Sequence, residues 1–124
     1  MHHLRVADAP TFDLPGVRFT ALAAPSRGSA GVCTWLLDVE PGLAPSDPHV
    51  IDEDEVFHVV AGAIRLSDDG PVVRAGEVAV VPAGERIRLS NAGTGAAKVH
   101  VAVRAGFTAT RADGTTIGTP AWAV

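Results

Sequence analysis

The sequence predicts an all-β protein, and three features of the chain support this prediction. Glycine and proline, 13 and 9 of the 124 residues, punctuate the sequence at intervals of about 8 to 12 residues. The stretches between them are short and rich in valine, isoleucine, leucine and threonine, most of which favour strands. No segment repeats its apolar residues every three to four positions, as an amphipathic helix does. This pattern is typical of a β-sandwich or a β-barrel.

The length of the chain predicts a single domain. At 124 residues it has the usual size of one domain, and we expect residues 1–124 to form it, with a barrel core over about 17–107 and an extension at each end. We expect Trp122 to anchor the C-terminal extension to the barrel. The expected strands lie near residues 17–24, 31–40, 55–60, 63–67, 71–74, 77–81, 86–90 and 97–104.

Composition and charge exclude several classes of function. Cys33 is the only cysteine, so the chain can form neither an internal disulfide nor a cysteine-based zinc cluster. The net charge is −4 and the ten basic residues are scattered, which argues against nucleic-acid binding. No apolar run approaches the roughly 20 residues of a membrane helix, and the N-terminus lacks the apolar core of a secretory signal. We therefore expect a cytoplasmic protein without a membrane partner.

Two groups of residues have the spacing of a known family, except that Gly42 lies one residue farther from His49 than the family's pattern allows. The first group consists of Pro41, Gly42, His49, Glu55 and Gly62. The second group consists of Gly76, Pro82, Gly84 and Asn91. Together they resemble the two motifs of the cupin superfamily, and the chain is most similar to small single-domain cupins of the cupin-2 type. The resemblance spans roughly residues 32–103 and implies a cupin jelly-roll β-barrel.

The resemblance breaks at the metal ligands. Cupins hold a metal ion with three histidines and a glutamate, and here His49 and Glu55 match two of the four positions. Ile51 and Ile87 stand where the other two histidines are expected. A catalytic divalent site ordinarily needs at least three protein donors, and isoleucine cannot coordinate. We therefore expect no tightly bound metal or other cofactor; a divalent metal, if the chain uses one, would bind His49 and Glu55.

Strand parity places the remaining candidates inside the barrel. Alternate residues of a strand point to opposite faces, so Glu55 and Phe57 face inward if the family's glutamate does. We expect the cavity to hold one small organic ligand. The residues expected to line it are Ile51, Phe57, Ile87, Leu89 and Trp35. For Trp35 a second interpretation, that it belongs only to the core, also stays open.

Glu55 and His49 are the candidate catalytic residues, and two interpretations of them stay open. One is a general acid/base pair that passes a proton to or from a bound ligand. The other is a buried hydrogen-bonded pair left over from a lost metal site.

The sequence does not decide whether the protein is an enzyme. The favoured hypothesis is a metal-independent cupin that binds a small organic molecule and, if it is an enzyme, acts as an isomerase, cyclase or lyase. One alternative is a metal-dependent, dioxygenase-like cupin with a reduced ligand set. Another is a non-catalytic sensor or storage domain. Small cupins are often dimers, so the resemblance also implies a homodimer.

Several polar residues are expected to face away from the cavity. Parity places His58 and His100 outside the barrel, as surface or subunit-contact residues rather than ligands of a metal. Arg86 and Arg88 flank Ile87 and are expected to point to solvent. The run from Asp52 to Asp54 is expected to be a solvated loop that precedes the strand beginning at Glu55.

Overall fold

A computed structural model describes all 124 residues and contains strands and short 3-10 helices but no α-helix. The 3-10 helices are η1 (Val6–Asp8), η2 (Pro25–Arg27) and η3 (Ala121–Ala123). The strands are β1 (Thr11–Leu14), β2 (Val17–Ala23), β3 (Val32–Val39), β4 (His49–Ile51), β5 (Glu55–Ala61), β6 (Ala63–Arg65), β7 (Val73–Arg74), β8 (Val78–Val81), β9 (Arg86–Ile87), β10 (Ser90–Asn91), β11 (Ala97–Arg104), β12 (Ala109–Arg111) and β13 (Thr116–Gly118). The predicted all-β class is confirmed. No helix of the structure is long and apolar enough to cross a membrane.

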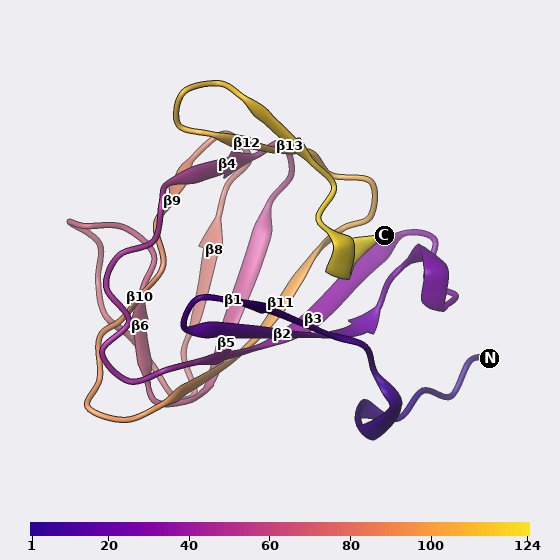
Figure 1. Ribbon diagram of the computed structural model, residues 1–124, viewed down its shortest axis with the longest axis horizontal. Helices are drawn as coiled ribbons and strands as arrows, with labels where there is room; N and C mark the ends of the chain where they lie inside the picture. Colours follow the sequence, from indigo (N-terminus) through magenta and orange to yellow (C-terminus); the bar gives the residue numbers. More distant parts are fainter.

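The strands form three antiparallel sheets around one core. The largest has the order β1-β2-β3-β11-β5-β8, the second β13-β12-β4-β9, and the third β10-β6-β7. In Figure 1 the four-stranded sheet lies across from strands β1 to β3 of the largest sheet, so that the sheets enclose the interior. A single cluster of 21 buried apolar residues fills that interior. This arrangement is the single-domain jelly-roll barrel that the sequence predicts.

The longer predicted strands are found within a few residues of their expected bounds, but the strand expected at 86–90 is wrong. It splits into β9, which pairs with β4, and β10, which pairs with β6. Between them the backbone N–H of Arg88 donates to Leu66, and that of Leu89 donates to the side chain of Ser46. The chain thus passes from one sheet to another at these two residues, a change of partner that composition does not reveal.

Four strands were not expected from the sequence: β1, β4, β12 and β13. Each is only three or four residues long, and each contains polar residues that break the apolar alternation. Three of them lie outside the expected core of 17–107. β1 and β13 form hairpins with strands adjacent in sequence, β2 and β12. β4 and β12 exist because distant segments supply hydrogen-bonding partners; Ile51, for example, pairs with Ala109.

The motif glycines occupy turns that need their conformational freedom. Gly62 and Gly84 both have positive φ, 74° and 84°, which side chains disfavour. At Gly62 a Cβ would also lie 2.6 Å from the carbonyl oxygen of Ala96, far inside contact distance. The turn between β5 and β6 therefore requires glycine on both counts.

The C-terminal segment closes one end of the barrel. The ring of Trp122 stacks on Phe19 with centroids 3.8 Å apart, and it lies 6.5 Å from the ring of Trp35. The thiol of Cys33 donates to the carbonyl of Ala123 at 3.2 Å, and the N–H of Ser26 donates to Val124 at 3.4 Å. Figure 1 shows η3 seated at this end, on the side where both termini lie. Trp122 anchors the tail as expected.

This anchor predicts a large effect of one substitution on stability. Trp122→Ala removes the stack on Phe19 and should lower the free energy of unfolding by about 2 to 4 kcal/mol. Val124→Ala, two residues on at an exposed position, is the control and should change it by less than about 0.5 kcal/mol. Urea unfolding measures both. Equal effects of the two substitutions would show that the tail is not anchored through the ring.

Candidate functional site

The candidate site is centred on Glu55, the first residue of β5. Its neighbours across the sheet are Val103 on β11 and Val81 on β8, both buried apolar residues. The side chain points into the barrel, and only 5% of the residue is exposed. The inward orientation predicted from strand parity is therefore confirmed. The expected lining residues are buried as well: Trp35, Ile51, Phe57, Ile87 and Leu89.

Glu55 differs from the acidic residues that precede it. Asp52 accepts the N–H of Thr108 at 2.7 Å, and Asp54 accepts the N–H of Ala83 at 3.0 Å. Those two exposed carboxylates thus fix the backbone of neighbouring segments. The buried Oε2 atom of Glu55, in contrast, has no hydrogen-bond partner. Leaving a buried polar atom unpaired lowers the stability of the fold by about 1 to 3 kcal/mol. Such an atom calls for an explanation, and a role in binding or catalysis is one.

The surroundings of Glu55 favour its neutral form. Burial among apolar side chains raises the pKa of Glu55 to about 8, because the carboxylate loses its hydration and gains no compensating partner. At neutral pH the side chain is consequently a carboxylic acid with one O–H to donate. Such a group can protonate a ligand or hydrogen-bond to a carbonyl oxygen inside a dry cavity.

His49 lies on β4, in a different sheet from Glu55. Its strand neighbours are Ile87 on β9 and Arg111 on β12. Burial lowers the pKa of the His49 imidazole, and a backbone hydrogen bond at Asp47 opposes this shift without cancelling it. The ring is therefore neutral at physiological pH and able to accept a proton.

No hydrogen bond or ion pair joins His49 to Glu55, and the Oε2 atom of Glu55 has no partner. The two residues therefore do not form a hydrogen-bonded pair, while their interpretation as the remnant of a lost metal site stays open. β4 and β5 belong to separate sheets, and the short strand β4 pairs with β9 and β12. The two groups offer an acid and a base that a ligand between them could connect.

The residues present do not fit a resident metal centre of the three-donor type. Only His49 and Glu55 could contribute at this position, and nowhere in the chain do three histidine, cysteine, aspartate or glutamate side chains come together. Ile51 and Ile87, 2% and 1% exposed, add apolar surface beside them. A bare divalent ion in such surroundings would lack both ligands and hydration.

The outward-facing residues mostly lie as expected. His58 and Arg86 are exposed, and His100 is half-buried on the outer face. Arg88 is a correction, because it does not simply point to solvent. Its guanidinium pairs with Asp68 at 2.8 Å and donates to the carbonyl of Ser46 at 2.9 Å. Arg88 thereby ties the crossing between β9 and β10 to two neighbouring loops.

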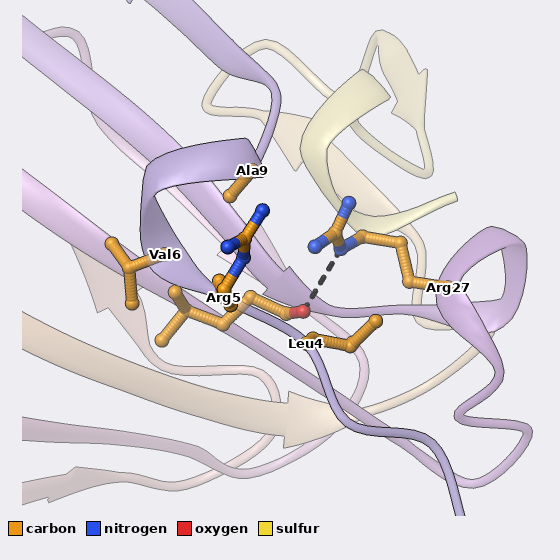
Figure 2. A pocket seen from close by; sticks show the side chains of 6 residues that line it. Leu4, Arg5, Val6, Ala9 and Arg27 are labelled. Carbon is orange, nitrogen blue, oxygen red and sulfur yellow. Dashed lines mark hydrogen bonds between the residues drawn. The ribbon is translucent and has the colours of Figure 1, made fainter.

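Two hollows on the surface lie away from these residues. One, of about 220 Å³, lies between the N-terminal segment and η2, where Arg27 donates to the carbonyl of Leu22 (Figure 2). The other, of about 430 Å³, runs along β1 and β2 beside Arg18 and Asp38. Neither is lined by a residue of the candidate site. That site is identified by the buried carboxyl group of Glu55 and the buried residues around it.

Sequence reasoning missed the residues that enclose Glu55 most closely. Val103 and Val81 are its direct strand neighbours. The apolar alternation in residues 97–104 and 77–81 indicates that both valines face inward, but only the register shows that they lie beside Glu55. At the closed end Trp35 and Trp122 were expected, but the contact of Trp35 with Phe107 gave no such signal, because it forms only in the folded chain.

The comparison with protein families decides the classification. The cupin domain family matches residues 35–103, more than half of the chain. The chain belongs to the cupin family. No curated protein matches it in sequence.

Solved structures place this cupin among proteins of the same fold. An RmlC-like cupin protein from Ralstonia eutropha JMP134 superposes with a TM-score of 0.75 and 18% identity, covering 97% of this chain and 78% of that one. The polyketide cyclase RemF from Streptomyces resistomycificus gives 0.73 and 16%, covering 98% and 88%. A candidate acetylacetone dioxygenase from Methylibium petroleiphilum PM1 gives 0.73 and 15%, covering 96% and 89%. At such identities the similarity concerns the fold alone.

The raised pKa of Glu55 predicts how stability depends on pH. Between the pKa of the unfolded carboxyl, near 4.5, and the folded value of about 8, the native state holds a proton that the unfolded state has lost. Stability should therefore fall as pH rises through this window, by at most about 1.4 kcal/mol per pH unit, and level off above it.

Glu55→Gln should abolish this dependence and stabilise the protein at pH 8. Glu53→Gln, a change of the same kind in the preceding loop, should leave the dependence intact. Urea unfolding between pH 7 and 8 measures both; below this range the histidines of the unfolded chain titrate, and above it the buried Cys33 thiol, whose pKa is raised, adds a pH dependence of its own. An unchanged slope in Glu55→Gln would contradict the protonated state of Glu55.

Proposed function

We propose that this cupin binds a small organic molecule inside its barrel beside Glu55 and acts on it by proton transfer, without a tightly bound metal. The observation that carries the proposal is the buried, unpartnered carboxyl group, which keeps its proton at neutral pH. Glu55 serves as the acid that donates to the ligand, and the neutral imidazole of His49 serves as the base. Isomerisation, cyclisation and lyase chemistry all need such a pair and no redox centre.

The residues around Glu55 favour an apolar or planar ligand with one or two oxygen atoms. Phe57, Trp35, Ile51, Ile87 and Leu89 offer apolar contacts, whereas Glu55 offers a single directed hydrogen bond. The fold of the polyketide cyclase RemF, which is similar over nearly the whole chain, agrees with a cyclase role without establishing it.

A metal-dependent, dioxygenase-like activity is the second candidate. The structural similarity to a candidate acetylacetone dioxygenase favours it, and His49 and Glu55 would then be the protein ligands. A non-catalytic sensor or storage role is the third candidate, and it uses the same interior without turnover. For all three we expect a homodimer located in the cytoplasm.

A ligand-binding test separates a functional pair from a structural remnant. The double variant Glu55→Met with His49→Leu replaces both groups by apolar ones of similar size. Because the Glu55 carboxyl is buried without a partner, we expect this variant to fold and to be at least as stable as the wild type at pH 8. Its control is Glu85→Met with His3→Leu, the same chemical changes at exposed positions.

Thermal unfolding of all three proteins is then measured with a panel of enolisable ketones and hydroxylated aromatic compounds, including acetylacetone. A compound at 100 times its Kd stabilises the native state by about 2.7 kcal/mol, enough to raise Tm by several degrees. The increase should appear in the wild type and the control and be lost in the double variant. An equal increase in the double variant would refute a role for Glu55 and His49 in binding.

Metal content separates the first candidate from the second. After purification without added metal and dialysis, the amount of iron, manganese, zinc or nickel should be the same in the wild type and in Glu55→Ala. This result is expected because two donors among isoleucines hold a divalent ion weakly. One metal ion per chain that disappears in Glu55→Ala would establish the dioxygenase-like alternative.

A further inference from the structure

The outer face of the largest sheet carries two histidines side by side. His58 on β5 and His100 on β11 are direct partners in the antiparallel register. Their side chains point away from the core, because the residues next to them in each strand, Phe57 and Val59 in one and Val99 and Val101 in the other, are buried. His58 is exposed and His100 is half-buried. The barrel site uses neither residue.

The direct pairing of these two residues suits one metal ion. Residues directly opposite each other on one face of an antiparallel pair have Cβ atoms about 4.5 to 5.5 Å apart. Two imidazole nitrogens on a tetrahedral zinc ion, each about 2.0 to 2.1 Å from it, are roughly 3.3 Å apart, which two converging rings on such positions can reach. The neighbouring ion pairs, Lys98 with Asp38 and Arg104 with Glu53, leave both rings free.

One chain cannot complete the coordination of such an ion. Two histidines fill half of a tetrahedral shell, and no third histidine, cysteine, aspartate or glutamate joins them. An identical pair from a second copy would supply the other half with the same geometry, since a two-fold axis brings the same residues together from both sides.

The surface around the histidines is suited to a second copy. His58 lies next to Val78 and His100 next to Leu36 across the sheet, and Val56 pairs with Val80 in the adjacent row. Val78 and Val80 are 57% and 59% exposed, on a strand that forms the edge of the sheet. Exposed apolar surface of this kind marks a protein contact.

The charges on this face stand at its two ends. Lys98 and Asp38 lie 3.4 Å apart at one end, and Arg104 and Glu53 lie 3.6 Å apart at the other. Each end holds one cation and one anion, so two copies can meet in either orientation without bringing only like charges together.

We propose that His58 and His100 form half of a site for a divalent transition ion of the zinc class, and that a second copy of this chain completes it. The ion then holds two barrels together through the outer faces of their largest sheets. Imidazole nitrogen suits zinc, nickel and copper, which makes zinc an appropriate probe. This site is separate from the interior around Glu55 and stands whether or not the barrel is catalytic.

Sedimentation at several protein concentrations, with and without Zn²⁺, tests the proposal. All proteins carry His2→Ala and His3→Ala, because two histidines near an exposed terminus also bind metal. In this background Zn²⁺ should lower the Kd of the dimer at least tenfold, with one ion bound per two chains. His58→Ala and His100→Ala should each abolish the effect, and a chelator should reverse it. Circular dichroism confirms that the variants remain folded.

Cobalt(II) provides a second readout, which reports the coordination of the ion rather than the sedimentation of the protein. A tetrahedral site of four imidazoles gives visible absorption several times more intense than that of octahedral aqueous cobalt, and His58→Ala should remove it. Three results would overturn the proposal: a dimer Kd unaffected by Zn²⁺, a zinc effect that persists in both histidine variants, or one ion per chain without association.

Discussion

The position of β11 between β3 and β5 is the constraint on which the rest of the structure depends. This central strand pairs along its whole length with β3, and along most of it with β5. Its register sets which residues of three adjacent strands face the core, because side chains alternate strictly between the two faces. One residue of slippage would bring Glu55 to the surface and His58 into the barrel. The same register therefore places both candidate sites.

Inside the barrel, the register surrounds a carboxyl group with apolar residues. Val103 and Val81 flank Glu55 and offer nothing to a negative charge, so the group keeps its proton. Electrostatics thus turns an ordinary glutamate into an acid suited to proton transfer near neutral pH. The same burial lowers the free energy of unfolding at pH values above the pKa of the unfolded carboxyl. Such a loss of stability is common where a strained or unpaired group has a function.

The closed end of the barrel depends on contacts between distant parts of the chain. Trp122 stacks on Phe19, and the tail carbonyls accept hydrogen bonds from Cys33 and Ser26. The tail therefore covers the core at the end where both termini lie, and it does so through ring stacking and backbone hydrogen bonds. The loop carboxylates of Asp52 and Asp54 have a similar role at the start of β5, each binding the backbone of a neighbouring segment.

The sequence by itself determined the all-β class, the cupin barrel and the direction of the side chains in the long strands. The cupin barrel is implied by the resemblance of the two motifs to that family. The class and the side-chain directions follow from turn residues such as Gly62 and Gly84, and from an alternation that spans seven or eight residues in β3, β5 and β11. Such features are local, and local sequence is enough to specify them.

Only the tertiary structure decided the short strands, the crossing at Arg88 and Leu89, and the absence of a hydrogen bond between His49 and Glu55. It also decided that His58 and His100, which are 42 positions apart in sequence, are neighbours on one face. The pairing of β4 with β12, the crossing and the histidine pair all depend on which distant strand supplies the hydrogen-bonding partner. Which strands pair is determined by the packing of the whole barrel, so it cannot be predicted from any one stretch of sequence.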